Sequence, residues 1–203
     1  MNDIIDFNKA ADQKSAKRQE ARQKIMETKT LEKGLIIVHT GKGKGKSTAA
    51  FGLVMRALGH GFKVGIVQFI KGAWETGEKY FLEKFPDQVI IRTMGEGFTW
   101  NTQDRARDIE MAKVAWNVAK DMIEDQSFKL IILDEINIAL RYDYLDIKQV
   151  LDVLNKKRTD LHIVLTGRNA KDELIEKADL VTDMTMIKHH FRNNVKAQPG
   201  IEF

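Results

Sequence analysis

The chain has 203 residues, a length that suits one domain with a full hydrophobic core and leaves little room for two. Lysine and arginine outnumber aspartate and glutamate by 33 to 29. Three of those lysines, Lys42, Lys44 and Lys46, stand in one glycine-rich segment, so the charge of the remaining chain is close to balanced. This distribution favours a small polyanionic ligand and argues against a nucleic-acid partner.

The absence of cysteine excludes disulfides and thiolate metal sites. No segment approaches the roughly 18 apolar residues of a membrane-spanning helix, and the first residues lack the basic-then-apolar layout of a signal peptide. We therefore expect a cytoplasmic protein with no membrane partner.

Residues 1–33 are rich in Lys, Gln, Glu, Ala and Arg. This composition is compatible with a helical arm that is marginal alone, and also with a solvated, disordered tail. We expect this arm to be separate from a nucleotide-binding domain that covers residues 34–203.

From Gly34 onward, short apolar runs alternate with helical patterns. This alternation predicts an α/β fold with a mostly parallel sheet of about six strands and helices on both faces. The predicted strands cover residues 35–40, 63–69, 89–93, 129–134, 161–166 and 180–187. The predicted helices cover residues 46–59, 75–85, 103–125, 146–157 and 171–177.

The first strand pattern runs into a glycine-lysine loop and then into a helix. Alternating glycines let consecutive backbone N–H groups turn toward an anion, and the helix that begins near Lys46 adds its positive dipole end. Lys46 is expected to reach the terminal phosphates and Ser47 to offer its hydroxyl to Mg²⁺. The interval from Gly41 to Gly45 is one residue shorter than in the usual P-loop, which predicts an altered phosphate register. The candidate nucleotide-binding residues are Thr40, Gly41, Lys42, Gly43, Lys44, Gly45, Lys46, Ser47 and Thr48.

A second apolar strand ends in two acids, Asp134 and Glu135. In P-loop proteins a strand near the phosphate loop delivers an acid to Mg²⁺. Neighbouring residues of a strand point in opposite directions, so the sequence leaves open which of the two contacts the metal. An acid pair after a strand can also simply begin a helix.

Other predicted strand ends carry further candidates. Gln68 and Lys71 follow the second strand, and they are either substrate contacts or ordinary strand-end and surface residues. Arg168 follows the fifth strand and is a candidate second clamp on phosphates. Phe98 and Trp100 place aromatic rings on a glycine-containing loop, where they either pack on a ligand or close the core. The histidines show no metal-ligand spacing, so no zinc site is assigned.

Six segments occur in order from about residue 34 to the end of the chain: T-G-K-G-K-G-K-S-T-A-A-F-G, V-Q-F-I-K-G, G-E-G-F-T-W, L-D-E-I-N, L-T-G-R-N and V-K-A-Q-P-G-I-E-F. Together they resemble the P-loop-type corrinoid adenosyltransferases. The resemblance implies a RecA-like fold, a homodimer, and transfer of the 5′-deoxyadenosyl group of ATP to Co(I) of a reduced corrinoid such as cobalamin, with release of triphosphate. It also implies Mg²⁺ and an electron donor such as a flavoprotein.

The resemblance also implies residue roles. Ser47 and Glu135 match the family's Mg²⁺-binding positions, while Phe98 and Trp100 match aromatics that lie below the corrin ring and exclude the lower axial ligand. Residues 1–33 look like the segment that covers the corrinoid in the family.

The chain departs from the family pattern at two places. Lys42 stands where a small polar residue is common, and residues 188–194 differ from the usual C-terminal loop. Two other functions are compatible with the motifs taken singly. One is an ATP hydrolase or kinase that uses Glu135 as a base at the γ-phosphate, and the other is a nucleic-acid-binding module that uses the basic arm.

Overall fold

The computed structural model describes residues 2–70, 76–94 and 104–202, and the chain divides into two compact units, Met1–Lys33 and Gly34–Phe203. The first unit contains helix α1 (Asn2–Glu27), so the arm is helical. The side chains of residues 12–33 are exposed. A helix whose side chains are exposed gains little from packing, so the stability of this helix rests mainly on local propensity.

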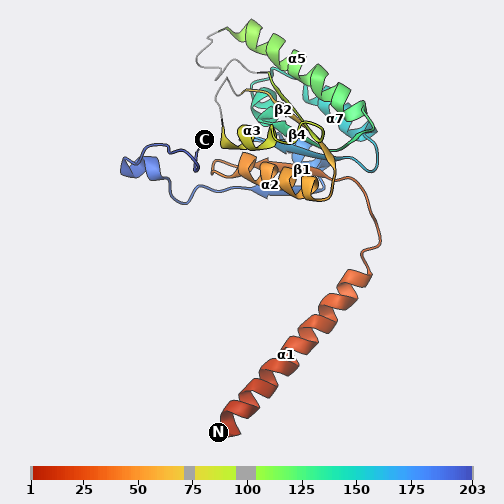
Figure 1. Cartoon of the computed structure of the whole chain (residues 1–203), viewed down its shortest axis with the longest axis vertical. Coiled ribbons are helices and arrows are strands. Elements are labelled where there is room, and N and C mark those ends of the chain that lie inside the picture. The colour runs from red at the N-terminus through yellow and green to blue at the C-terminus, as the bar shows by residue number, and fades with distance from the viewer. Residues whose placement is uncertain (1, 71–75, 95–103, 203) are drawn as a thin grey trace. The chain divides into compact units, whose positions relative to one another are not determined.

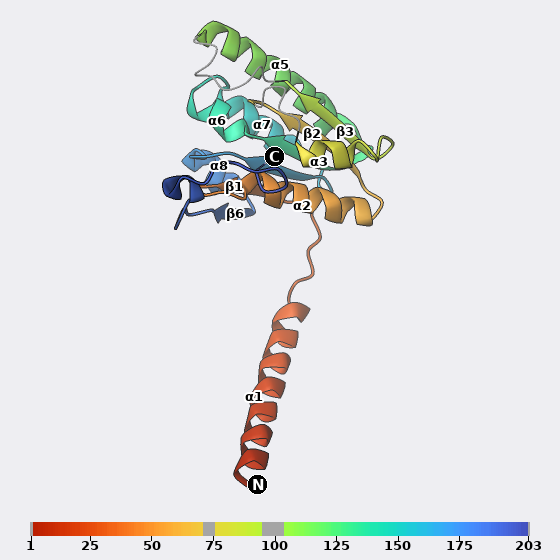
Figure 2. The same ribbon diagram turned by 60° about the vertical axis from the view of Figure 1, so that its left-hand side comes forward.

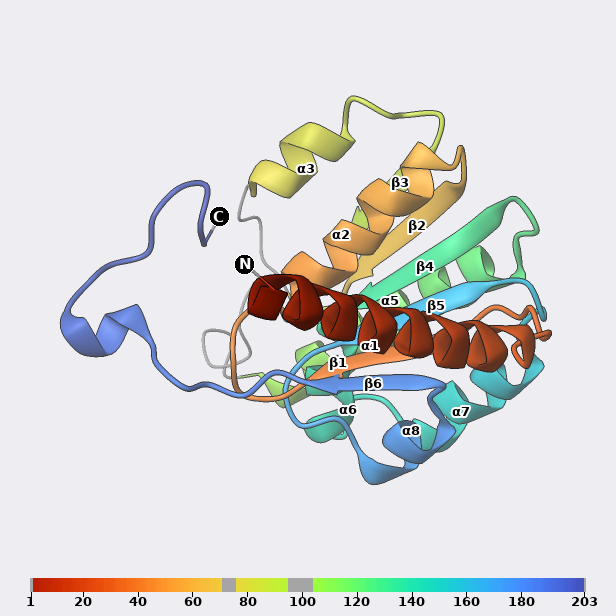
Figure 3. The same ribbon diagram turned by 90° about the horizontal axis from the view of Figure 1, so that it is seen from below.

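The second unit is built on one six-stranded sheet in the order β3-β2-β4-β5-β1-β6, in which every pair of neighbours is parallel (Figure 3). The strands are β1 (Ile36–Thr40), β2 (Lys63–Gln68), β3 (Val89–Thr93), β4 (Phe128–Asp134), β5 (His162–Thr166) and β6 (Leu180–Asp183). Strand β5 separates the strand before the glycine-lysine loop, β1, from the strand that ends in the acids, β4. The predicted α/β fold, with a parallel sheet of six strands and helices on both faces, is confirmed.

Helices cover both faces of the sheet (Figures 1 and 2). They are α2 (Lys46–Gly59), α3 (Gly77–Leu82), α5 (Arg105–Glu124), α6 (Ile136–Arg141), α7 (Ile147–Lys156) and α8 (Asp172–Lys177). The 3₁₀ helix η1 (His190–Asn193) lies in the C-terminal segment, away from the sheet (Figure 3). Strand side chains alternate between two buried clusters: Ile36 and Val38 pack with α5, α6, α7 and α8, whereas Ile37 packs with α2 and α3. None of the helices in the described residues is long and apolar enough to span a bilayer.

Helix α5 illustrates how the sequence pattern becomes structure. Its apolar residues recur at helical spacing and are buried against the sheet, among them the core residue Trp116. Asp104 caps the helix, because its side chain accepts a hydrogen bond from the N–H of Arg107 at 3.1 Å.

The last strand is shorter than predicted. Residues 180–187 were expected to form it, but β6 ends at Asp183. Its neighbour β1 ends at Thr40, and from there the chain packs across the glycine-lysine loop. The N–H of Met184 donates to the carbonyl of Thr40 at 2.9 Å, and the Met184 carbonyl accepts from the N–H of Gly43 at 2.6 Å. The prediction of a strand through residue 187 is therefore wrong, because the backbone partner that would continue the ladder has turned away into the loop.

A half-buried histidine on β5 makes stability depend on pH. Nδ1 of His162 accepts a hydrogen bond from the N–H of Leu35 at 3.1 Å, and burial lowers the pKa of His162. The unfolded chain therefore binds the proton more readily, and the free energy of unfolding falls as the pH drops below the unfolded pKa of about 6.5. We expect urea unfolding to give a lower free energy at pH 5.5 than at pH 7.5, and His162→Gln to flatten this dependence. An unchanged slope in the variant would contradict the assignment.

Candidate functional site

Polar residues lie side by side at the last position of four neighbouring strands and at the next-to-last position of β1. In sheet order they are Thr93 on β3, Gln68 on β2, Asp134 on β4, Thr166 on β5 and His39 on β1. Because all strands are parallel, this polar row runs across the carboxyl edge of the sheet, where α/β proteins bind ligands. The row lies on the face that α2 covers, and α2 follows directly from the glycine-lysine loop.

The glycine-lysine loop has the strand-loop-helix context that the sequence predicted. Gly41 and Gly45 have φ values of 97° and 103°, in the left-handed region that favours glycine, and Gly45 is the N-cap of α2. A Cβ at Gly41 would lie 2.3 Å from Oδ1 of Asp183, and one at Gly43 would lie 2.5 Å from the carbonyl oxygen of Met184. These two glycines are therefore also required by the close packing of the chain after β6.

The loop amides differ from the expectation at one position. The N–H of Gly43 donates to the carbonyl of Met184, so it is directed at the chain after β6 and not toward the centre of the loop. The N–H of Ala49 donates to the carbonyl of Gly45 at 2.8 Å and closes the first turn of α2. An anion at this loop would be held by the remaining amides and by the cations.

Three cations converge on the loop. Lys46 is buried, and its ammonium donates to the carbonyl oxygen of Gly43 at 2.5 Å. Burial lowers the pKa of Lys46, and the positive charges of Arg168 and Lys44 lower it further, while nearby carboxylates act against them. Lys44 stands in the same loop, and Arg168 follows Gly167, whose N–H donates to the carbonyl of His39 on β1 at 3.2 Å. A bound phosphate chain would relieve the repulsion among the three.

Lys44 is paired with the C-terminal segment. Its ammonium forms an ion pair with Glu202, whose second carboxylate oxygen lies 3.4 Å from Nε2 of His190. The hydrogen bond from Lys44 lowers the pKa of Glu202. His190, the first residue of η1 in the divergent segment 188–194, thus lies next to the carboxylate that pairs with the glycine-lysine loop. Sequence analysis did not single out Glu202, and no periodicity in the tail points to it.

The remaining predicted loop residues take different positions. Thr40 is buried, and its hydroxyl oxygen accepts a hydrogen bond from the N–H of Ala170 at 3.0 Å, which ties the end of β1 to the chain after β5. Lys42 and Thr48 are exposed, as is Arg168.

Asp134 holds the serine of the loop. The Ser47 hydroxyl donates to Oδ1 of Asp134 at 2.7 Å, and the Thr166 hydroxyl donates to the same oxygen at 2.8 Å. Nε2 of Gln68 donates to Oδ2 at 3.1 Å. Asp134 is completely buried. The Ser47 hydrogen is therefore committed to Asp134, and the lone pairs of the Ser47 oxygen are the part of the hydroxyl that can meet a cation.

Glu135 adopts a strained backbone at the start of α6. Its φ of 64° and ψ of 17° lie in the left-handed region, which costs a non-glycine residue about 1–2 kcal/mol. Its N–H donates to the hydroxyl oxygen of Thr166 at 2.9 Å. Oε2 of Glu135 lies near Gly167, where an added Cβ would come within 3.2 Å of it. The acid pair therefore both ends β4 and begins α6, a helix that the sequence did not predict.

The strain at Glu135 yields a paired test. Glu135→Gly relieves the left-handed penalty and Glu135→Ala does not, so the glycine variant should be the more stable of the two by about 1 kcal/mol. Both variants lack the carboxylate and should lose activity to the same extent. Urea unfolding and turnover measured side by side check this. Equal stabilities would contradict the strain, and unequal activities would contradict a role for the carboxylate.

Two buried side chains near the polar row were not predicted. Asn137 is fully buried, and its Nδ2 donates to the carbonyl of Gly167 at 3.0 Å. Both ring nitrogens of His39 are buried without a hydrogen-bond partner among residues 2–70, 76–94 and 104–202, and burial lowers the pKa of His39. The predicted residues Phe98, Trp100 and Lys71 lie outside the described residues.

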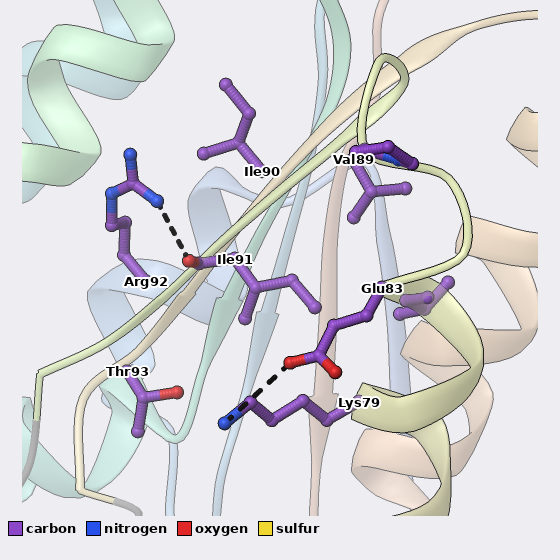
Figure 4. A pocket seen from close by; sticks show the side chains of 9 residues that line it. Lys79, Glu83, Val89, Ile90, Ile91, Arg92 and Thr93 are labelled. Carbon is purple, nitrogen blue, oxygen red and sulfur yellow. Dashed lines mark hydrogen bonds and ion pairs between the residues drawn. The ribbon is translucent and has the colours of Figure 1, made fainter.

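A pocket of about 460 Å³ lies away from the loop, between α3 and the edge strand β3 (Figure 4). It contains none of the predicted site residues. Its walls are lined by Lys79, Leu82, Glu83, Pro86, Val89, Ile90, Ile91, Arg92 and Thr93. Thr93 lines this pocket and is also the last residue of the polar row.

Comparison with known proteins finds a matching family model and several similar proteins. Residues 32–203 match the family model described as ATP:corrinoid adenosyltransferase BtuR/CobO/CobP. A corrinoid adenosyltransferase from a Sinorhizobium species is 59% identical over 192 residues, which cover 94% of this chain and 90% of that one. The corrinoid adenosyltransferases of Pseudomonas aeruginosa and Escherichia coli are 49% and 45% identical, over 95% and 85% of this chain and 97% and 87% of theirs. The solved structure of a KaiC-like protein from Pyrococcus horikoshii is 19% identical, covers 75% of this chain and 73% of its own, and has a TM-score of 0.45.

Proposed function

The chain belongs to the ATP:corrinoid adenosyltransferase family and is a transferase, and we propose that it moves the 5′-deoxyadenosyl group of ATP to the cobalt of a reduced corrinoid. The observation that carries the proposal is a glycine-lysine loop whose serine is held by a buried aspartate, with buried Lys46 and also Lys44 in the loop and Arg168 on the neighbouring segment after β5. Such a site is suited to a phosphate chain that leaves as a highly charged anion.

The proposed reaction is a nucleophilic displacement at carbon. Co(I) attacks C5′ of the ribose, a cobalt–carbon bond forms with the cobalt electron pair, and the C5′–O bond breaks. The bonding electrons leave with triphosphate, and cobalt becomes formally Co(III). No water needs to be activated, so the catalytic demand falls on stabilising the leaving group. Lys46 supplies a buried positive charge for this purpose, and Lys44 and Arg168 add theirs.

The residues present also fit Mg²⁺. Magnesium prefers oxygen ligands, and Ser47 and Glu135 present a hydroxyl and a carboxylate beside the phosphate loop. We propose that these two residues contact the ion and that Asp134 holds Ser47 in place through the 2.7 Å hydrogen bond. When bound, Mg²⁺ would neutralise part of the triphosphate charge.

The sequence and its resemblance to the family lead to further proposals. Residues 1–33 cover the corrinoid and residues 34–203 form the transferase domain. Phe98 and Trp100 exclude the lower axial ligand so that Co(II) is reduced more easily. The enzyme works as a homodimer in the cytoplasm, and an electron donor such as a flavoprotein supplies the reducing electron.

One incubation tests the proposed function. The full chain is supplied with ATP, Mg²⁺ and chemically reduced cobalamin, and we expect a light-sensitive organocobalt product together with intact triphosphate. A reaction without reductant serves as the control and should give neither. Release of ADP or orthophosphate in place of triphosphate would contradict the proposal and indicate a hydrolase or kinase.

A further inference from the structure

The polar row continues beyond Asp134 to two residues that have no assigned role, Gln68 and Thr93. We propose that they are positioning residues, which fix the carboxylate of Asp134 and, through it, the Ser47 hydroxyl for binding of Mg²⁺ and ATP. The proposal rests on the proposed function of the same site, and it adds a side-chain relay that reaches the open edge of the sheet.

Gln68 is oriented by its partners at both ends. It is buried, its Nε2 donates to Oδ2 of Asp134 at 3.1 Å, and its Oε1 accepts from the hydroxyl of Thr93 at 2.9 Å. An ionised carboxylate can only accept hydrogen bonds, so Gln68 must present its NH₂ group to Asp134. The amide oxygen then faces Thr93, which completes the relay by donating to it. Gln68 is thus directed at the acid that holds Ser47 and not at a substrate.

The relay determines where the Asp134 carboxylate points. Oδ1 receives the hydroxyls of Ser47 and Thr166, and Oδ2 receives the Gln68 amide, so contacts on both oxygens fix the plane of the group. Rotation about χ2 of aspartate is otherwise soft. Removing the Gln68 contact releases this rotation, and turning of the carboxylate moves Oδ1 away from Ser47.

The backbone holds the relay residues in register. Gln68 pairs with Thr93 on one side and with Asp134 on the other. The Gln68 carbonyl accepts from the N–H of Met94 at 3.0 Å, and the N–H of Phe69 donates to the carbonyl of Asp134 at 3.0 Å. Thr93 is exposed on the edge strand and lines the pocket of Figure 4. Its substitution therefore leaves no buried cavity, and the hydroxyl can be removed without loss of packing.

The test compares substitutions at the two edges of the sheet. Thr93→Val removes the hydroxyl and keeps the shape, Thr93→Ser keeps the hydroxyl, and Gln68→Met removes the amide. Thr182→Val is the matched control. Thr182 is exposed on the opposite edge strand, β6, where it pairs with His39 of β1. Calorimetric titration of the full chain with ATP at a series of Mg²⁺ concentrations gives the Mg²⁺ concentration at which half of the maximal ATP affinity is reached.

We expect Thr93→Val to raise that Mg²⁺ concentration about 3- to 10-fold, and Gln68→Met to raise it at least as much, as the loss of one hydrogen bond predicts. Thr93→Ser and Thr182→Val should stay within about twofold of the unchanged chain. The Mg²⁺ concentration for half-maximal turnover should move in parallel, with a smaller change in kcat at saturating Mg²⁺. A purely structural role would lower melting temperature and kcat without moving the Mg²⁺ dependence.

An unchanged Mg²⁺ dependence in Thr93→Val would overturn the proposal, and so would failure of Thr93→Ser to restore it. If Gln68→Met does not fold, the Thr93 pair decides the question alone. The binding measurement also separates this inference from the proposed function. A chain that binds ATP in a Mg²⁺-dependent manner but forms no organocobalt product would contradict adenosyl transfer. The calorimetric titrations of the variants would still decide whether Gln68 and Thr93 position Asp134.

Discussion

Lys46→Ala is expected to lower kcat by about 100- to 1,000-fold, the effect of removing one preorganised electrostatic donor from a site where charge develops. Lys46 is buried, and its ammonium donates to the Gly43 carbonyl, so its charge acts where water screens it little. Single-turnover kinetics with saturating ATP and reduced cobalamin measure the loss. Lys156→Ala removes an exposed lysine from α7 and serves as the control, with unchanged kcat.

The stability of the same variant distinguishes loss of function from loss of fold. Burial and two neighbouring cations lower the pKa of Lys46, so the folded protein does not gain from its charge. We therefore expect the melting temperature of Lys46→Ala to stay within about 3 °C of the unchanged chain. Near-normal turnover would contradict the role of Lys46, and a collapse of stability would show that its hydrogen bond to Gly43 is structural.

The phosphate loop could be predicted because its requirements are local. A run of apolar residues ends at Thr40, positive φ is needed at Gly41 and Gly45, and a helix-forming stretch follows. Each of these features is written in adjacent residues. The helical arm is different, because the helix and the disordered tail have the same composition, and only the structure separates them.

The identity of the acid that contacts Ser47 could not be predicted from the sequence. Ser47 and Asp134 are 87 positions apart, and the choice between Asp134 and Glu135 depends on which face of β4 each occupies. Asp134 follows Leu130 and Ile132 on the face that α2 covers, which brings it to Ser47. Glu135 has already left the strand in a left-handed conformation, and no propensity rule places a glutamate there.

Gln68 shows what the alternating pattern of a strand can predict and what it cannot. Val64, Ile66 and Gln68 recur with period two, which places Gln68 on the same face as its apolar neighbours. The sequence therefore predicts the face of the sheet on which Gln68 lies, but it does not predict how β2 aligns with β4. That alignment brings the Gln68 amide to Asp134. The contact between Lys44 and Glu202 spans 158 positions and joins a loop to an irregular tail, so no periodic signal exists for it.

Asp134→Asn is expected to lower Mg²⁺ affinity about 10- to 100-fold while preserving the fold, as removal of a group that supports a metal ligand does. The asparagine can keep Oδ1 as acceptor for Ser47 and Thr166, and its NH₂ then faces Gln68. The Gln68 amide can rotate so that its oxygen faces the introduced asparagine and its NH₂ faces Thr93, since the Thr93 hydroxyl is able to accept as well as donate. The hydrogen bonds re-form in the reverse direction, and only the negative charge is lost.

Comparison of Asp134→Ala with Asp134→Asn separates the effect of the charge from the effect of the hydrogen bonds. It leaves the Ser47, Thr166 and Gln68 donors without the carboxylate that receives them, at a cost of about 1–3 kcal/mol for each buried donor left unpaired. We expect the alanine variant to be clearly less stable than Asp134→Asn in urea unfolding, whereas both need more Mg²⁺ for half-maximal ATP binding. If Asp134→Asn keeps the Mg²⁺ dependence of the unchanged chain, then the charge of Asp134 has no part in binding the ion, and Glu135 and Ser47 must suffice.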